Sequence, residues 1–373
     1  MSVLLITAII AGFFAVVANQ QYKLATEIHK VRKNGKLNLS SYYLFVFLSI
    51  ATLAVVSGLR FAVGSDYGSY YWGYPRWEME FAERWKNWDE PGLSTLAKLL
   101  YPISQDGGFF IFTLAVITIF LFGFTIARNT DNYFFCLAIY IFTSWTGCFN
   151  GTRQFLAAAI LFAGHKLILD RKFIKFCILV FIAASFHITA LIMLPMYFLI
   201  TEVLDLKKIT LIMSTGIALI FSYDFLFELL GFIKDSETGG AETSYAQREI
   251  HPLRILIALA PIIVYFFLLF QKKGFTGREN FYMGFIFVRA AVIFGTSNSA
   301  YLNRAGIYFA PFIAIALALL VNKFPKNQQF IIKATIIILY LIVWIYIDIS
   351  KIDWHWMWDR PAYQNKYAYL TES

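Results

Sequence analysis

Arginine, histidine and carboxylate residues occur in this sequence at points where apolar runs begin, end or break. Arg60 closes one apolar run, and Asp66 follows it six residues later. Glu90 precedes a Pro-Gly pair, Arg153 stands at the head of another apolar run, and His187 lies inside a third. Arginine binds phosphate oxygens through a planar fork that stays charged, and a carboxylate or imidazole can take a proton from an attacking hydroxyl. These residue types therefore indicate recognition of an anion combined with activation of a hydroxyl group.

The composition places these residues in a membrane protein. Hydrophobic residues make up 59% of the 373 residues, charged residues make up 15%, and the mean hydropathy is +0.62. One water-soluble fold of this length could not bury that much apolar surface. A bilayer core about 30 Å thick requires about 17 to 25 apolar residues per helical span. Apolar runs that we interpret as spans cover residues 3–19, 42–59, 109–127, 133–147, 154–169, 209–230, 253–270, 281–296, 305–321 and 330–347.

A further apolar stretch, residues 173–200, is too long for one ordinary span and too short for two. As a single helix it would put the basic residues at 171–175 and those at 207–208 on opposite faces of the membrane. As a hairpin of two short helices turning near residues 185–187, it keeps both basic clusters on one side, which the positive-inside rule favours. Irregular backbone at membrane depth is tolerated beside protein or a wet cavity. The hairpin therefore predicts a cavity next to His187.

The same rule predicts the orientation of the whole chain. Basic residues between positions 23 and 36 give the strongest cytoplasmic signal, and alternation of the spans then puts both termini outside the cytoplasm. The outer face receives a loop at residues 60–108, in which the leucine spacing after Glu90 predicts a short interfacial helix. We expect an all-α polytopic membrane protein with a single domain, residues 1–373, and about 12 transmembrane helices including the hairpin.

Several partners and cofactors are disfavoured. The net charge of +9 is spread mostly over short loops predicted to be cytoplasmic, so topology explains it without nucleic acid. Cys136, Cys148 and Cys177 show no metal-ligand spacing, and neither a Gly-rich phosphate loop nor an HExxH or GxSxG pattern occurs. We expect no metal and no cofactor.

The predicted topology brings the isolated polar residues to one depth at the outer face. Three arginines with nearby carboxylates and a histidine fit recognition of a lipid-linked pyrophosphate and activation of a hydroxyl nucleophile. Each residue also has a structural alternative. Arg60 or Arg304 alone could contact lipid headgroups, Asp66 could cap a turn, and His187 could be a hydrogen-bonded core residue.

Further residues suggest a cavity and a surface for sugars. Arg289 lies inside an apolar run and should face a partner or a wet cavity, because an arginine facing lipid is costly. Asp224 and Glu228, one helical turn apart, could supply that partner. The tyrosines and tryptophans at residues 67–77 could stack on sugar rings, although an interfacial aromatic belt explains them equally well.

At these residues the chain resembles the EpsG family of Wzy-like polysaccharide polymerases. The resemblance depends on the order and spacing of residues 59–70, 90–92, 150–157 and 186–187. It covers residues 58–199 well, and the later half mainly through hydropathy and Arg304. It implies a GT-C-like fold in the bacterial inner (cytoplasmic) membrane. The implied activity is a glycosyltransferase that polymerises undecaprenyl-diphosphate-linked oligosaccharide repeat units at a site facing the periplasm or the outside.

For such a reaction we assign the following roles to the candidate residues from their chemistry. The donor pyrophosphate is expected to contact Arg60, Arg153 and Arg304. The acceptor base is expected to be Asp66 or His187, with Glu90 as a third candidate. Sugars are expected to contact Tyr67, Tyr70 and Asn150, and Arg289 and Gln154 are expected to line the cavity.

The implied partners are the lipid-linked glycan donor and acceptor, the bilayer, and a protein that regulates chain length. Two other functions remain open. A flippase or transporter for the same lipid-linked oligosaccharide would need polar groups along a path between the two faces. An O-antigen ligase would share the donor chemistry and differ in its acceptor.

Overall fold

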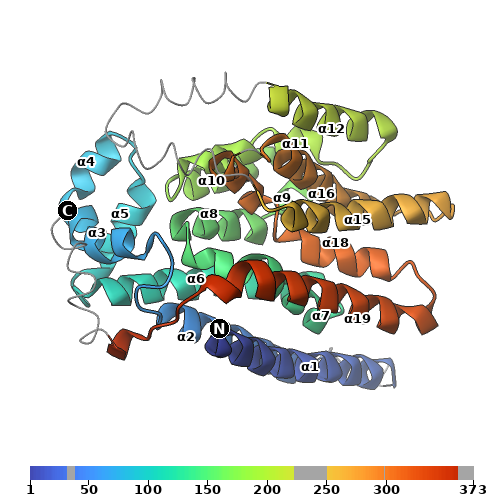
Figure 1. The fold of residues 1–373 in the computed structure, drawn as a ribbon, viewed down its shortest axis with the longest axis horizontal. Helices are drawn as coiled ribbons and strands as arrows, with labels where there is room; N and C mark the ends of the chain where they lie inside the picture. Colours follow the sequence, from blue (N-terminus) through green and yellow to red (C-terminus); the bar gives the residue numbers. More distant parts are fainter. Residues whose placement is uncertain (32–37, 222–249, 298, 360–373) are drawn as a thin grey trace. The chain divides into compact units, whose positions relative to one another are not determined.

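The structure is a computed structural model, and it describes residues 1–31, 38–221, 250–297 and 299–359 (Figure 1). In this part of the chain every regular element is a helix, apart from one isolated bridge between Arg60 and Trp356. The prediction of an all-α chain is confirmed for these residues. Asp224 and Glu228, suggested as partners for Arg289, lie outside the described residues.

Five helical stretches of the described chain are long and apolar enough to cross a membrane. By their length and composition they indicate a membrane protein, and they coincide with apolar runs that the hydropathy identifies. The number of about 12 spans and the GT-C-like architecture stay predictions. The five stretches are α1 (Ser2–Val31), α2 (Ser40–Gly58), α6 (Gly107–Asn129), α15 (Pro252–Phe270) and the continuous stretch Lys326–Lys351, which begins with α19 (Lys326–Val343).

Shorter helices occupy the remaining apolar runs and the predicted outer loop. Between residues 133 and 149 the backbone is first α-helical, then π-helical and finally 3₁₀-helical, and a turn follows. The shorter elements are α3 (Tyr67–Met79), α4 (Phe81–Lys86), α5 (Pro91–Leu100), α7 (Tyr133–Tyr140), η1 (Ile141–Trp145), η2 (Thr146–Phe149), α8 (Thr152–Ala163), α9 (Lys166–Leu169), α10 (Phe173–Ala184), η3 (Ile188–Met193), α11 (Met196–Leu199), α12 (Leu206–Phe221), α16 (Gly277–Gly295), α17 (Ala300–Asn303), η4 (Arg304–Tyr308), α18 (Phe312–Val321), η5 (Trp344–Asp348), η6 (Ile349–Lys351) and η7 (Met357–Asp359).

The chain divides into two compact units. The first comprises Met1–His165, Cys177–Leu191 and Ala334–Ser373, and the second comprises Lys166–Phe176 and Ile192–Lys333. Three predictions about the membrane architecture stay predictions. They are the single domain, the outer loop at residues 60–108 and the hairpin at residues 173–200.

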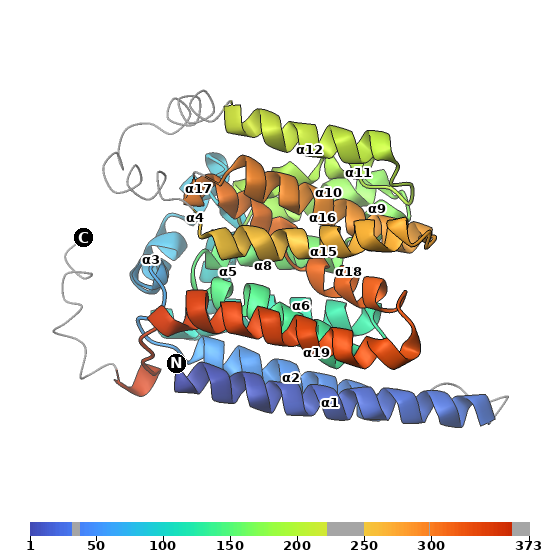
Figure 2. The ribbon, with the colours of Figure 1, turned by 45° about the vertical axis from the view of Figure 1, so that its right-hand side comes forward.

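In the first unit the long helices pack in sequence order. Helix α1 packs on α2, α2 packs on α6, and α6 packs on α8 (Figures 1 and 2). The short helices α3, α4 and α5 lie together at one end of α6 (Figure 1). In the second unit α16 packs against α12, α15 and α18 (Figure 2).

A turn interrupts the apolar stretch at residues 173–200. Helix α10 ends at Ala184, and the next helical element begins at Ile188. The chain then returns toward its starting point, because the rings of Phe173 and Tyr197 lie 4.9 Å apart and the Arg171 guanidinium donates to the Tyr197 carbonyl at 2.7 Å. His187 consequently lies in the turn between the two arms.

Close backbone contact joins α3 to α6. Asp106 begins α6 by accepting a hydrogen bond from Gly108 N at 3.1 Å. A Cβ atom at Gly107 would lie 2.1 Å from the carbonyl oxygen of Tyr71, closer than real contacts allow. Glycine at this position therefore lets the two helices approach, and this contact holds α3 at the end of the long helix.

We predict that Gly107→Ala lowers the unfolding free energy by about 1–3 kcal/mol, because the added methyl group overpacks the contact with α3. The apparent melting temperature of the protein purified in detergent measures the effect. Gly274→Ala is the matched control, since no atom lies within 4 Å of its added Cβ. Equal melting temperatures for both variants would contradict the prediction.

Candidate functional site

Two loops of the first unit interlock before α3 and α8 begin. Gly64 adopts a left-handed conformation (φ 101°), and a Cβ there would lie 2.5 Å from the carbonyl oxygen of Phe149. Ser65 N donates to Asn150 Oδ1 at 2.6 Å, and Gly151 N donates to Asp66 Oδ2 at 2.8 Å. Asp66 and Asn150 thus join the two loops in this structure. These contacts support the turn-organising interpretation of Asp66, and the predicted contact of Asn150 with sugar stays a prediction.

The interlocked loops place Tyr70 beside Arg153. The Tyr70 hydroxyl accepts hydrogen bonds from Arg153 N and Arg153 Nε, both at 3.2 Å. The guanidinium also lies over the Tyr70 ring, 5.6 Å from its centroid. Because Tyr70 is on the first turn of α3 and Arg153 is on the first turn of α8, these contacts fix the direction of the arginine side chain.

Glu90 joins Arg153 to His187. Its carboxylate accepts a hydrogen bond from Arg153 Nη1 through Oε2, and its Oε1 lies 3.4 Å from His187 Nδ1. The start of α5 is held against the hairpin turn by a hydrogen bond from Gly92 N to the Ser185 carbonyl at 2.8 Å. Residues more than 60 positions apart in the sequence therefore meet at one carboxylate.

The Glu90 carboxylate is largely buried, with 12% of its side chain exposed. Burial raises the pKa of Glu90, but the hydrogen bond with His187 and the charge of Arg153 outweigh it, so the pKa lies below its ordinary value. Glu90 is therefore an anion near neutral pH. As an anion it is better suited to orienting the imidazole and the guanidinium than to accepting a substrate proton.

Two groups of this cluster are available for chemistry, Nε2 of His187 and Nη2 of Arg153. When Nδ1 of His187 carries the proton facing Glu90, the lone pair on Nε2 can act as a base. Arg153 Nη2 has no hydrogen-bond partner in the described part of the chain, and 36% of the arginine side chain is exposed. The arrangement can therefore accept a proton and bind an anion at neighbouring positions.

Arg60 is enclosed rather than open to a ligand. It is 1% exposed, and its guanidinium donates to the carbonyl oxygens of Ser57 and Val63, the latter at 3.3 Å. The rings of Phe149 and Tyr67 lie 5.1 and 5.9 Å from the guanidinium carbon. Burial lowers the pKa of Arg60 to about 10, so the side chain stays charged at neutral pH. Its contacts stabilise the end of α2, and pyrophosphate binding by Arg60 stays a prediction.

A short C-terminal segment covers the backbone around Arg60. Phe61 N donates to the His355 carbonyl, and Met357 N donates to the Leu59 carbonyl, both at 2.9 Å. These bonds run on either side of the Arg60–Trp356 bridge. The C-terminal segment that contains Trp356 therefore packs on the chain at the end of α2, beside Arg60.

The tyrosines expected to contact sugar form a core beneath the site. Tyr67 is 3% exposed and Tyr70 is 2% exposed. Their rings pack in one cluster with residues of α3, α5, α6 and α8. The ring faces of Tyr67 and Tyr70 pack against other side chains here, and their contact with sugar stays a prediction. The Tyr70 hydroxyl is part of the site through its bonds with Arg153.

The remaining candidates are divided between the two units. Gln154 is 3% exposed, and its amide donates to Thr189 Oγ1 at 3.4 Å, which links α8 to the segment after His187. Arg289 lies within α16, and Arg304 begins η4, both in the second unit. The cluster around Glu90 is built from the first unit, and the predicted roles of Arg289 and Arg304 stay predictions.

Sequence reasoning ranked Glu90 below Asp66 and His187 and did not single out Ser185. The spacing of Glu90-Pro91-Gly92 carried a usable signal, since proline favours the first turn of a helix and glycine permits close backbone approach. Among the described residues, no group of three or more His, Cys, Asp and Glu side chains could hold a metal ion.

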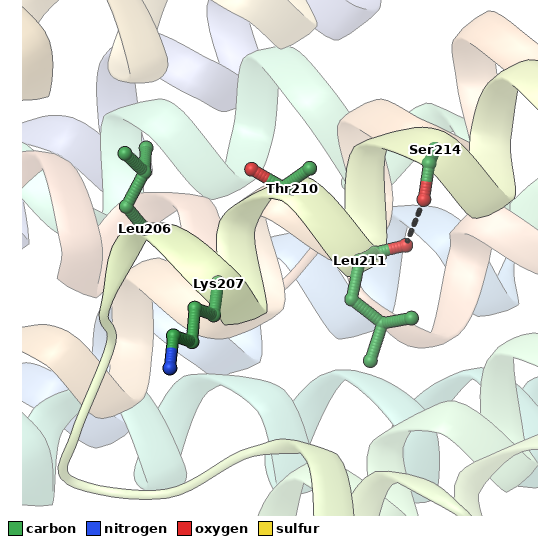
Figure 3. A pocket seen from close by; sticks show the side chains of 5 residues that line it. All are labelled: Leu206, Lys207, Thr210, Leu211 and Ser214. Atoms are coloured by element: carbon green, nitrogen blue, oxygen red, sulfur yellow. Dashed lines mark hydrogen bonds between the residues drawn. The ribbon is translucent and has the colours of Figure 1, made fainter.

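A separate hollow lies on α12 in the second unit (Figure 3). Its lining comes from one helix and includes one charged side chain, Lys207, with Leu206, Thr210, Leu211 and Ser214. Figure 3 shows the Lys207 side chain on this helix and the hydrogen bond from Ser214 to the Leu211 carbonyl. The hollow contains no cluster of acid, base and anion-binding groups, so the cluster at Glu90 is the better candidate site.

We predict that Glu90→Gln lowers the unfolding free energy by about 2 kcal/mol near neutral pH, because it removes a charge that is hydrogen-bonded to Arg153. The folded pKa of Glu90 lies below its ordinary value of 4.5. Its stabilising contribution is therefore present above pH 4.5 and is lost as the pH falls through the lower, folded pKa.

Melting temperatures of wild type and Glu90→Gln, measured in detergent from pH 7 downward, test this dependence. The difference should be constant above about pH 5 and should shrink in more acidic buffer. Asp170→Asn is the control, because Asp170 pairs with Lys172 at 2.8 Å with 45% of its side chain exposed, and surface pairs contribute little. A difference in melting temperature between wild type and Glu90→Gln that increases as the pH falls would contradict the predicted direction of the effect.

Comparison with known proteins agrees with the sequence prediction. The model of the EpsG family matches residues 43–358, which include every element of the Glu90 cluster. No curated protein matches the chain, and no solved structure matches it. The family indicates a Wzy-like polysaccharide polymerase in general terms and a role in polysaccharide biosynthesis. The apolar helices indicate a membrane protein. The chain belongs to the EpsG family.

Proposed function

We propose that this protein is a glycosyltransferase that polymerises undecaprenyl-diphosphate-linked oligosaccharide repeat units at the extracytoplasmic face of the bacterial inner membrane. The observation that carries the proposal is the meeting of Glu90, Arg153 and His187 at the end of the long helices of the first unit. A base next to an anion-binding guanidinium is what transfer of a sugar from a diphosphate leaving group requires.

In the proposed reaction His187 is the base. Its Nε2 takes the proton of an acceptor hydroxyl while the hydroxyl oxygen forms a bond to the anomeric carbon of the donor. The bond between this carbon and the phosphate oxygen breaks, and the diphosphate leaves with the electron pair. Glu90 holds the imidazole and stabilises the imidazolium that forms, as the carboxylate does in an acid–histidine pair.

Arg153 is the proposed ligand of the diphosphate. Its Nε and Nη1 are held by Tyr70 and Glu90, so Nη2 is directed without further ordering of the side chain. Fixed donors of this kind stabilise the charge that develops on a leaving group. Asp66 and Asn150 position Arg153 indirectly, because their hydrogen bonds hold the loop before α8. Arg60 stabilises the start of the other loop through its bonds to the Ser57 and Val63 carbonyls.

The membrane arrangement proposed here follows the charge distribution. In this proposal the positive-inside rule assigns the connections rich in Lys and Arg to the cytoplasmic side and the cluster to the outer face. The shorter apolar helices, including α10 and the arm after His187, complete about 12 spans of a GT-C-like protein in this proposal. The partners are the lipid-linked donor and acceptor, the bilayer, and a protein that regulates chain length.

We predict that His187→Ala lowers kcat about 10²- to 10⁴-fold, the usual contribution of a general base. The assay uses purified protein in liposomes with lipid-linked repeat units, and gel ladders report chain length. His29→Ala is the control, because His29 lies exposed near the end of α1 and should leave the ladder unchanged.

The same assay separates the proposed function from its alternatives. Wild-type protein that moves glycan only onto a foreign acceptor is a ligase. Wild-type protein that moves lipid-linked units across the bilayer without extending them is a transporter. A full ladder from His187→Ala would overturn the assignment of the base.

Asp66→Asn distinguishes the two bases that the sequence left open. The Asn side chain keeps an oxygen that can accept the hydrogen bond from Gly151 N, so a positioning role predicts kcat within about tenfold of wild type. A base role predicts a loss of 10²-fold or more, because an amide cannot take the proton. Asp66→Ala, which removes the acceptor, should be more damaging than Asp66→Asn under the positioning assignment. Equal, large losses for both variants would return Asp66 to the role of base.

A further inference from the structure

Two exposed tryptophans precede Glu90 in the sequence, Trp85 on the last turn of α4 and Trp88 in the connection between α4 and α5. Trp85 and Trp88 are 45% and 43% exposed, and their rings meet edge to face with centroids 6.1 Å apart. Trp88 is two residues from Glu90 in the sequence. This pair contrasts with Tyr67 and Tyr70, whose rings are buried in the core.

The connection is held in place by polar contacts. The Arg84 side chain is 13% exposed and donates to Glu80 Oε2 at 2.9 Å and to Asp89 Oδ2 at 2.6 Å. Trp85 Nε1 donates to Thr95 Oγ1 at 2.9 Å, and this hydroxyl in turn donates to the Pro91 carbonyl. The Trp85 ring is therefore fixed in direction although nearly half of it is open to the surroundings.

The backbone of the connection is strained. Trp88 has φ 53° and Glu90 has φ 50°, both in the left-handed region that residues other than glycine seldom adopt. Strain of this kind persists where surrounding contacts hold it, and it is concentrated at functional sites. Here it sets the directions of an exposed indole and of the carboxylate that binds His187.

We propose that Trp85 and Trp88, with the Asp89 carboxylate, form a carbohydrate-binding subsite for the glycan of the repeat unit, in the segment that leads directly to Glu90. The indole faces stack on sugar rings. The Asp89 side chain, 59% exposed, accepts hydrogen bonds from sugar hydroxyls. The proposal rests on the proposed function and names the surface that holds its substrate.

The charge of this region favours a glycan over lipid headgroups. Residues 76–90 contain five acidic residues (Glu78, Glu80, Glu83, Asp89 and Glu90) and three basic residues (Arg76, Arg84 and Lys86) in a chain whose net charge is +9. Segments that bind anionic lipids are rich in Lys and Arg. An acidic segment with exposed indoles instead matches a neutral ligand that has apolar ring faces and many hydroxyl groups.

The test measures binding of free oligosaccharides, released by partial hydrolysis of the polysaccharide of the source cell, to full-length protein in nanodiscs. Calorimetry gives Kd, and saturation-transfer NMR shows whether sugar protons lie against aromatic rings. Trp85→Ala and Trp88→Ala should each raise Kd about tenfold, and Trp88→Phe should restore most of the binding, because a ring face is retained.

Trp358→Ala is the matched control. Trp358 is 62% exposed and belongs to the C-terminal segment, outside the connection between α4 and α5. Its loss should leave Kd unchanged. An equal loss for Trp358→Ala and Trp88→Ala would show a general membrane-anchoring effect and would overturn the subsite. An unchanged Kd for Trp85→Ala and Trp88→Ala, or no binding by wild type, would overturn it as well.

Failure of the subsite and failure of the proposed function give different results. Tryptophan-dependent binding without chain extension by wild type would support the subsite and contradict the polymerase. Chain extension by wild type with an unchanged KM in Trp85→Ala and Trp88→Ala would contradict the subsite and support the polymerase.

Discussion

The arrangement of the site depends on one buried negative charge, the carboxylate of Glu90. A carboxylate removed from water is costly unless positive or hydrogen-bonding groups surround it. Arg153 and His187 meet this requirement, and each comes from a different part of the chain. The start of α5, the head of α8 and the turn after α10 must therefore converge. Tyr70 adds a fourth element by holding the guanidinium from α3.

Much of the helical pattern could be predicted from hydropathy, because long apolar runs have few alternatives to helix in a bilayer. The predicted runs at residues 42–59, 109–127 and 253–270 correspond closely to α2, α6 and α15. The π- and 3₁₀-helical turns after α7 have no such signal, since they depend on packing. The break near residues 185–187 was found through charge topology, an independent constraint.

The residue types identified the candidate residues in the sequence. Their roles depend on contacts in space, which a single sequence does not reveal. Arg60 looks like an exposed ligand because it ends an apolar run, yet Phe149 and the C-terminal segment enclose it. Tyr67 and Tyr70 follow a polar loop and are nevertheless buried, because Gly64 and Gly107 let α3 approach its neighbours. Glu90 carries one charge in an acidic loop, and its contacts with Arg153 and His187 show a use that the Glu90-Pro91-Gly92 signal alone does not specify.

The pairing of residues 59–61 with residues 355–357 also concerns how the protein is made. A membrane protein is synthesised and inserted from its N-terminus, so the end of α2 leaves the ribosome long before its pairing partner exists. Until residues 355–357 have been synthesised, the backbone on either side of Arg60 lacks the segment that pairs with it. The region beneath the site can therefore reach its final form only after residues 355–357 have followed α2 through synthesis and insertion.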